Sequence, residues 1–133
     1  MNCNLNLISL VCFQSSEARE DEIYLVFRGK KIWPLNGKFK ELTSNSTQDI
    51  NLEISNIQMN KPITIELWEH DIFFDDNLGF FEFLIDCIGG EFVTDLKRKA
   101  PDFVSRYSLK WSSKEKGKRL NQKELKDLNK VER

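Results

Sequence analysis

A chain of 133 residues and 15.7 kDa is long enough for one domain with an extension. Hydrophobic residues make up 40% of it, and its 10 Phe, 3 Trp and 2 Tyr can supply one globular core. The net charge of −1 argues against a nucleic-acid-binding protein, because such proteins normally carry a strongly basic surface.

Short strands follow one another along the first half of the chain. Four are predicted there, at residues 5–13, 23–27, 31–33 and 38–42. Residues 15–22 are polar and charged, which predicts a loop. Asn36-Gly37 predicts a hairpin turn, because both residues tolerate positive φ.

The second half of the chain continues this pattern. Strands are predicted at residues 50–54, 63–68, 78–85 and 103–111. Residues 94–100 predict one or two helical turns that stop before Pro101. Tyr107, Leu109 and Trp111 share one face of the last strand. About eight short strands with almost no helix predict an all-β sandwich.

The last segment, residues 112–133, differs from the rest. It carries 8 Lys and Arg against 4 Asp and Glu, whereas the preceding residues are acidic overall. Its few large apolar residues, Leu120, Leu125, Leu128 and Val131, loosely share a helix face. We expect a basic polar tail or a short helix there, solvated or touching acidic lipid or a partner.

The most informative segment is residues 63–79, ITIELWEHDIFFDDNLG. It begins as a strand and ends in a loop with four acidic residues, Glu69, Asp71, Asp75 and Asp76. Glu69 and Asp71 are two residues apart, so at a strand end both side chains point the same way, and Asp76 can return to them after the turn. Phe73 and Phe74 stand at the tip. Carboxylates beside exposed aromatic residues suggest a cation site next to an apolar anchor.

Each of these residues also has a simpler interpretation. Asp75 and Asp76, followed by Asn77, are typical of tight turns. One of the two phenylalanines could fold back onto the sandwich. His70, the only histidine, is predicted to be a surface residue rather than a ligand.

An enzyme is hard to build from this chain. A nucleophile needs a positioned base, and one histidine is present. The sequence contains no G-x-S-x-G motif and no glycine-rich phosphate loop. We therefore expect a binding protein without catalytic activity.

The three cysteines, Cys3, Cys12 and Cys87, show no spacing typical of a metal site. We expect free thiols in a reducing compartment, with Cys12 and Cys87 as small core residues. The apolar run at residues 5–13 is interrupted by polar residues and lacks a preceding basic segment, unlike a signal peptide. These features predict a cytoplasmic protein.

Two segments resemble C2 domains. The run L-W-E-H-D-I-F-F-D-D-N-L-G is similar to the third loop of that family, where an acidic residue, any residue and an aspartate precede a short loop and D-D-x-x-G. Residues 20–25, EDEIYL, resemble the family's S-D-P-Y-V element, with Asp21 at the loop-one ligand position and Tyr24 at the aromatic position. The resemblance covers residues 5–111.

The resemblance implies an eight-stranded antiparallel C2-like β-sandwich at residues 1–111, with calcium or phospholipid chemistry at one end. The metal ligands that it implies are Asp21, Glu69, Asp71, Asp75 and Asp76. Calcium would bridge them to an acidic phospholipid membrane while Phe73 and Phe74 enter it, so the protein would be peripheral to the membrane. A lysine-rich strand face that could bind lipid headgroups is formed by Lys30, Lys31, Lys38 and Lys40.

Two departures from the family pattern keep an alternative open. Residues 14–17, QSSE, lack the usual early loop-one aspartate, and Glu69 stands where aspartate is usual. These departures favour a calcium-independent C2-like protein that acts as a protein-interaction or assembly subunit. The retained acidic loop with Phe73 and Phe74 favours the calcium and membrane interpretation.

Overall fold

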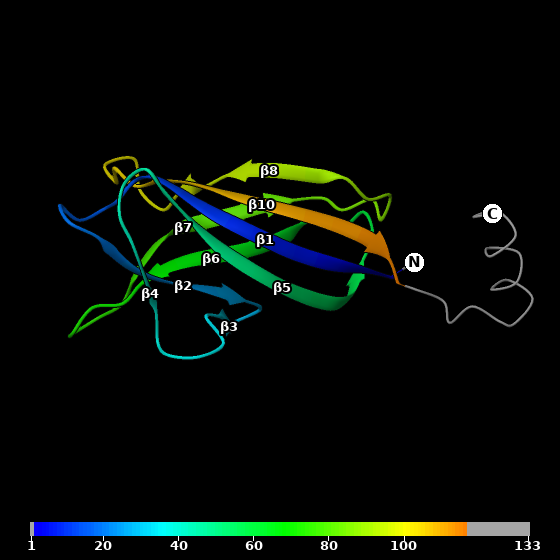
Figure 1. The fold of residues 1–133 in the computed structure, drawn as a ribbon, viewed down its shortest axis with the longest axis horizontal. Helices are drawn as coiled ribbons and strands as arrows, with labels where there is room; N and C mark the ends of the chain where they lie inside the picture. Colours follow the sequence, from blue (N-terminus) through cyan, green and yellow to red (C-terminus); the bar gives the residue numbers. More distant parts are fainter. Residues whose placement is uncertain (1, 117–133) are drawn as a thin grey trace, which may run out of the picture.

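The structure, a computed structural model, describes residues 2–116 and arranges them in a sandwich of two antiparallel sheets (Figure 1). The strands are β1 (Asn2–Gln14), β2 (Asp21–Phe27), β3 (Lys30–Trp33), β4 (Lys40–Leu42), β5 (Ser46–Gln58), β6 (Ile63–Glu69), β7 (Asp76–Phe83), β8 (Glu91–Asp95), β9 (Lys97–Arg98) and β10 (Arg106–Glu115). One sheet has the order β5-β1-β10-β8. The other has the order β3-β2-β6-β7-β9, with β4 also paired to β2. None of the described residues forms a helix that could cross a membrane.

Alternation of apolar and polar residues directs one face of each central strand into the core. In β6, Ile63, Ile65 and Leu67 are buried between the sheets. In β10, Tyr107 and Leu109 do the same, as predicted. The predicted all-β sandwich is confirmed, with ten strands instead of eight because β4 and β9 are only three and two residues long.

Four connections meet at one end of the sandwich, on the left in Figure 1. They comprise residues 15–20, 43–45, 70–75 and 99–105, and we call this end the loop end. The first two are joined by a hydrogen bond from Ser15 N to Ser44 Oγ at 2.9 Å. The described chain begins and stops at the opposite end, where Lys116 N donates to Asn2 O.

The prediction of helical turns at residues 94–100 is wrong. This segment belongs to β8, which pairs with β10, and to β9, which pairs with β7 across the sandwich. Pairing satisfies the main-chain groups that a helix would otherwise satisfy. Phe92 of β8 also stacks on Trp111 at 4.9 Å, which fixes this strand against the core.

The hairpin predicted at Asn36-Gly37 is also wrong. β4 pairs with residues 21–23 of β2 and β3 pairs with residues 25–27, so the two short strands follow one another along the same edge. Gly37 does adopt positive φ, at 82°. The turn therefore has the predicted backbone conformation but joins strands that share a partner.

β10 runs further than the sequence suggested. It continues through Ser112 to Glu115, so these residues belong to the sandwich and not to a tail that starts at residue 112. The predicted tail or short helix from residue 117 onward lies outside the described residues.

The expectation of free thiols is wrong for two of the three cysteines. Cys3 and Cys87 form a disulfide, with their Cα atoms 5.6 Å apart, within the usual range for such bonds. The start of β1 and the connection after β7 meet at the end of the core away from the loop end, which a sequence separation of 84 residues conceals. Cys12 is free and buried in the core, as expected.

Gly79 of β7 offers a test of this packing. Its φ is 146°, and a Cβ atom there would collide with the main-chain carbonyl of Lys97 in β9. We expect Gly79→Ala to lower the free energy of unfolding by about 2 to 4 kcal/mol, because neither backbone can move without breaking the β7–β9 pairing. Urea denaturation measures the change.

Gly37→Ala is the matched control. Its φ is also positive, but no atom lies within 4 Å of the added Cβ, so it should cost only about 1 kcal/mol of backbone strain. Equal losses for the two variants would contradict the close approach of β9.

Candidate functional site

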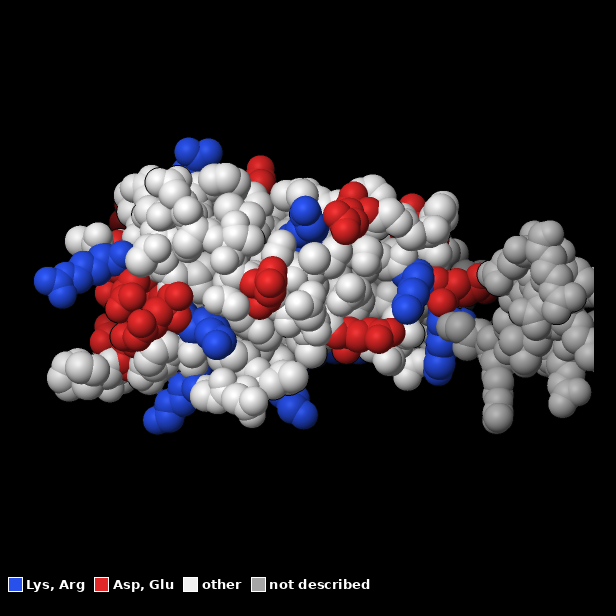
Figure 2. All heavy atoms as spheres, in the orientation of Figure 1, with Lys and Arg blue, Asp and Glu red and all other residues white. Residues whose placement is uncertain are grey.

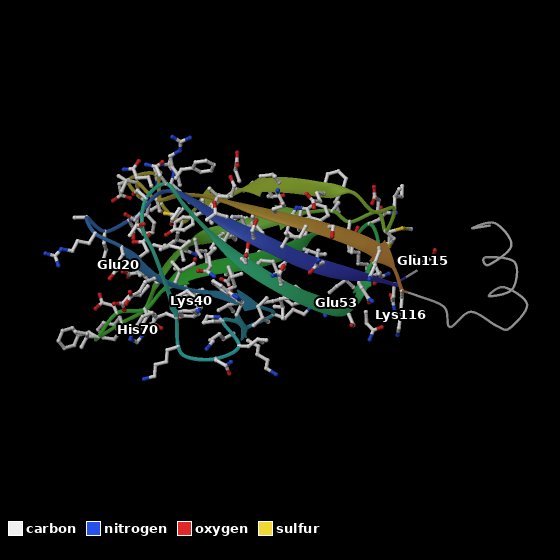
Figure 3. The ribbon with its side chains drawn as sticks, in the orientation of Figure 1. Glu20, Lys40, Glu53, His70, Glu115 and Lys116 are labelled. Atoms are coloured by element: carbon white, nitrogen blue, oxygen red, sulfur yellow. A yellow bond between two sulfur atoms is a disulfide. The ribbon has the colours of Figure 1, made fainter. Side chains whose placement is uncertain are left out.

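Acidic side chains gather at the loop end of the sandwich, where Figure 2 shows a dense group of carboxylates. Glu20, Lys40 and His70 lie at this end in Figure 3, whereas Glu53, Glu115 and Lys116 lie toward the other. The site is therefore built from strand ends and from the connections between them.

Asp21, the first residue of β2, lies inside this end and is fully buried. Its carboxylate accepts four hydrogen bonds. The donors are Ser16 N at 2.8 Å, Ser16 Oγ at 2.7 Å, Glu17 N at 3.0 Å and Tyr107 Oη at 2.5 Å. Burial acts to raise the pKa of Asp21, but its hydrogen bonds to Glu69, Tyr107 and Ser16 outweigh burial and hold the pKa below its usual value.

Glu69, the last residue of β6, lies beside Asp21 and is only 4% exposed. Ser16 Oγ lies 2.7 Å from Asp21 Oδ1 and 3.0 Å from Glu69 Oε2. A hydroxyl group has one proton and can donate to only one of these oxygens, so the cluster needs another proton. Burial, with the adjacent hydrogen bond and charge of Asp21, raises the pKa of Glu69 to about 9. Glu69 is therefore protonated at neutral pH, and the pair carries one negative charge.

Other titratable groups surround this pair. Burial and the Asp21 hydrogen bond raise the pKa of Tyr107, and burial raises the pKa of the Cys12 thiol next to it. A cavity of about 290 Å³ opens beside Glu69 and is lined by Glu17, Asp76 and Asp102 among others. Asp76 thus reaches the same region, opposite Glu69 in the β6–β7 register.

Asp71 and Asp75 form a separate network on the outer side of the sheet. Asp75 accepts hydrogen bonds from Tyr24 Oη at 2.5 Å and Asp71 N at 3.1 Å, and its carboxylate lies 3.3 Å from His70 Nδ1. These hydrogen bonds, that of Tyr24 first, lower the pKa of Asp75. Asp71 Oδ1 accepts a hydrogen bond from Ile72 N at 2.6 Å.

The alternation of β2 and β6 explains why the acidic residues separate. Asp21 and Glu69 point inward with Ile23 and Leu67, whereas Tyr24, which holds Asp75, points to the other face. β6 ends at Glu69, so the expectation that Glu69 and Asp71 point the same way is wrong. Asp71 and Asp75 instead have the turn chemistry that was the simpler interpretation.

The tip of this loop is apolar and exposed. Ile72, Phe73 and Phe74 are 88%, 85% and 84% exposed. The interpretation in which one phenylalanine folds back onto the sandwich is therefore wrong. His70 stacks on Phe39 at 5.1 Å and pairs with Asp75, so it supports the base of the loop.

The calcium prediction can be tested against this geometry. Calcium needs six to eight oxygen ligands. The Asp21 oxygens are already taken by four donors, Glu69 holds a proton, and Asp75 is bound to Tyr24. Within residues 2–116, no three His, Cys, Asp or Glu side chains lie close enough to share a metal ion. The residues present do not fit the predicted ion.

The lysine residues predicted to bind headgroups lie along the edge of the second sheet. Lys30 and Lys31 are in β3 and Lys40 is in β4, both beside β2. Lys31 Nζ donates to Gly37 O at 2.5 Å. Lys38 flanks Phe39, which contacts His70. Their role in lipid binding stays a prediction.

Sequence reasoning missed three residues of this end: Ser16, Tyr107 and Ile72. Ser16 lies in the QSSE segment, where the absence of an aspartate is evident but the donor in its place is not. Tyr107 lies far along the chain and reaches Asp21 only through the β1–β10 pairing. Ile72 could have been found, because it continues the apolar run between two aspartates.

Comparisons with known proteins bear on the fold. No protein-family model matches the chain, and no curated protein matches it. A solved structure of a C2 domain is similar with a TM-score of 0.56 and 19% identity, over 86% of this chain and 96% of that one. The first of the C2 domains (domain A) of plant extended synaptotagmin 1 has a TM-score of 0.55 and 8% identity, over 88% and 96%. The paired A and B C2 domains of extended synaptotagmin 2 give 0.52 and 15%, over 85% of this chain and 40% of that one.

These likenesses establish a C2-like fold for the chain and confirm the resemblance predicted from residues 20–25 and 63–79. At such low identities they concern the fold alone. What the module binds has to be argued from its own residues.

The protonated Glu69 predicts an unusual pH dependence. The folded chain keeps a proton up to a pKa of about 9 that an unfolded glutamate loses near its ordinary value of 4.5. Stability is therefore fully present below pH 4.5 and falls as the pH rises toward 9. Asp21, whose pKa is lowered, acts in the opposite direction but only at acidic pH.

We expect Glu69→Gln, which mimics the protonated acid, to raise the free energy of unfolding at pH 8 by about 1 to 3 kcal/mol. It should also flatten the decline between about pH 6 and 9, as measured by urea denaturation at several pH values. Glu53→Gln, at an exposed position of β5, is the control and should change neither. A loss of stability in Glu69→Gln of equal size at every pH would contradict a protonated Glu69.

Proposed function

We propose that this chain is a C2-like membrane-binding module that inserts Ile72, Phe73 and Phe74 into a lipid bilayer without calcium. The observation that supports this most directly is the exposure of three consecutive large apolar side chains at one loop tip. An exposed apolar group of this kind on a folded domain is typical of an interaction site.

The size of the apolar tip is sufficient for reversible binding. Burying one large apolar side chain contributes roughly 1.5 to 3 kcal/mol, so three partly inserted side chains contribute about 5 kcal/mol. This is comparable to the marginal membrane affinity of a single acyl anchor. A second contact would add to it.

The base of the loop is suited to present this tip. Asp75 connects Tyr24, His70 and the main chain of Asp71, and His70 stacks on Phe39. A loop held in this way loses less conformational entropy on binding than an unsupported one. The tip can then enter the bilayer without first being ordered.

The proposal departs from calcium-dependent recruitment to acidic phospholipid. The buried Asp21–Glu69 pair is compensated by hydrogen bonds and a proton, so no cation is required to relieve it. Asp71, Asp75 and Asp76 near the tip would repel acidic lipid, while Lys38 and Lys40 beside Phe39 would attract it. We therefore expect insertion to depend on the apolar residues more than on lipid charge.

Vesicle sedimentation tests the proposal. We expect the protein to bind phosphatidylcholine vesicles in the presence of a calcium chelator, and the double variant Phe73→Ser/Phe74→Ser to bind at least about tenfold more weakly. Leu84→Ser/Ile88→Ser is the matched control. It removes two exposed apolar residues from the connection after β7, and it should bind as the parent does.

Each other outcome counts against the proposal. Equal binding of the Phe73→Ser/Phe74→Ser variant would exclude insertion of the tip. Binding that appears only with added calcium and acidic lipid would support the calcium-dependent alternative instead. Failure to bind any vesicle would favour a protein partner.

A protein-interaction role is the second candidate, and β8 supports it. This strand lies at the edge of its sheet, and four of its five residues are exposed, including Phe92 and Val93. A partner could add a strand to this edge. Loss of partner binding after Val93→Lys, with vesicle binding intact, would assign the interaction to β8.

A binding role without catalysis is part of the proposal, since His70 is engaged by Asp75 and Phe39. Peripheral attachment to a membrane follows from it. A cytoplasmic location stays a prediction. The Cys3–Cys87 disulfide bears on that prediction, because disulfides persist mainly in oxidising compartments.

A further inference from the structure

A second cavity of about 200 Å³ lies at the loop end, apart from the one beside Glu69. It is formed where the end of β1, the link between β8 and β9, and the start of β10 meet. The residues that matter to its chemistry are Phe13, Asp95, Arg98, Ser105, Arg106 and Ser108.

Ser105 is the first indication of a ligand. It is fully buried, and its hydroxyl group has no hydrogen-bond partner in the described structure. A buried hydroxyl without a partner costs about 1 to 3 kcal/mol, and such groups are uncommon in folded proteins. A ligand with an acceptor oxygen would remove this cost.

The two arginines are the second indication. Neither Arg98 nor Arg106 forms an ion pair with any of the described residues. Arg98 Nη1 donates to Phe103 O at 2.7 Å, which fixes its guanidinium group. The Arg106 guanidinium lies 6.0 Å from the centre of the Phe13 ring. Two oriented cations thus border the cavity.

One acidic residue, Asp95, also lines the cavity. Its Oδ1 already accepts a hydrogen bond from Ser108 Oγ at 2.5 Å. Two arginines against one aspartate leave the lining with a positive charge. The lining therefore favours an anion over a cation.

We infer that this cavity binds an oxyanion, specifically a phosphate group, held by Arg98 and Arg106 and by the hydroxyl of Ser105. Guanidinium groups suit phosphate oxygens because they offer parallel N–H donors in a plane. The free N–H groups of Arg98 and Arg106 donate to the anion. The Ser105 hydroxyl donates the remaining hydrogen bond.

The position of the cavity fits either of two sources for the phosphate. It opens at the same end as Ile72, Phe73 and Phe74, so a lipid headgroup could reach it during insertion. A free phosphate could enter it equally well. The inference concerns the phosphate group itself and does not depend on membrane insertion.

Titration of the full chain with inorganic phosphate, followed by amide chemical shifts, is the first test. We expect saturable shifts centred on Ser105 and Arg106, beyond those caused by sodium chloride at equal ionic strength. Arg106→Gln should weaken binding about five- to tenfold. Ser105→Ala should also weaken binding without loss of stability, because it removes an unsatisfied hydroxyl.

Lys110→Gln, on the same strand but paired with Glu91 outside the cavity, is the control and should bind as the parent does. No saturable shift, or equal binding by Arg106→Gln and the parent, would overturn the inference. Unfolding curves of each variant exclude loss of the fold as the cause.

Vesicles of phosphatidylcholine with and without phosphatidic acid then distinguish the sources. Tighter binding to phosphatidic acid that Arg106→Gln abolishes and inorganic phosphate competes away would assign the cavity to a lipid phosphate. Phosphate binding in solution with no such preference would assign it to a free anion. Both results support the site, and neither depends on whether the Phe73→Ser/Phe74→Ser variant binds membranes.

Discussion

The loop end of this sandwich depends on one buried cluster, in which Asp21 and Glu69 share the hydroxyl of Ser16 and receive Tyr107. The cluster joins the first connection to β2, β6 and β10, and therefore ties both sheets together. Two buried carboxylates would repel one another strongly if both were charged. A single proton on Glu69 removes one charge, and the four donors around Asp21 compensate the other.

The same strands hold a second network on their opposite face. Tyr24 follows Asp21 by three residues and therefore points outward, where it binds Asp75 and fixes the loop that carries Phe73. The inner network stabilises the end of the sandwich, and the outer network supports an apolar tip. This division explains why residues that look like one set of ligands in the sequence act in two separate ways.

Much of the fold could be predicted, because alternation in residues 63–68 and 107–111 directly reflects burial between two sheets. The separation of Asp21 from Asp75 could not, since it depends on where β6 ends and on which face Tyr24 occupies. Residues 94–100 were misassigned because their strands are set by pairing with β10 and β7, which local sequence does not encode. The Cys3–Cys87 contact was missed for the same reason.

The departure of residues 14–17 from the C2 pattern has a physical meaning in this light. Where an aspartate is usual in the family, this connection brings Ser16, which supplies a main-chain and a hydroxyl donor to Asp21. Another carboxylate there would have added negative charge that only a cation could balance. A donor instead satisfies the existing charge from within the protein. Hydrogen bonds and a proton thus meet the need that an ion would meet, and the exposed apolar residues at the tip remain available for contact with a membrane.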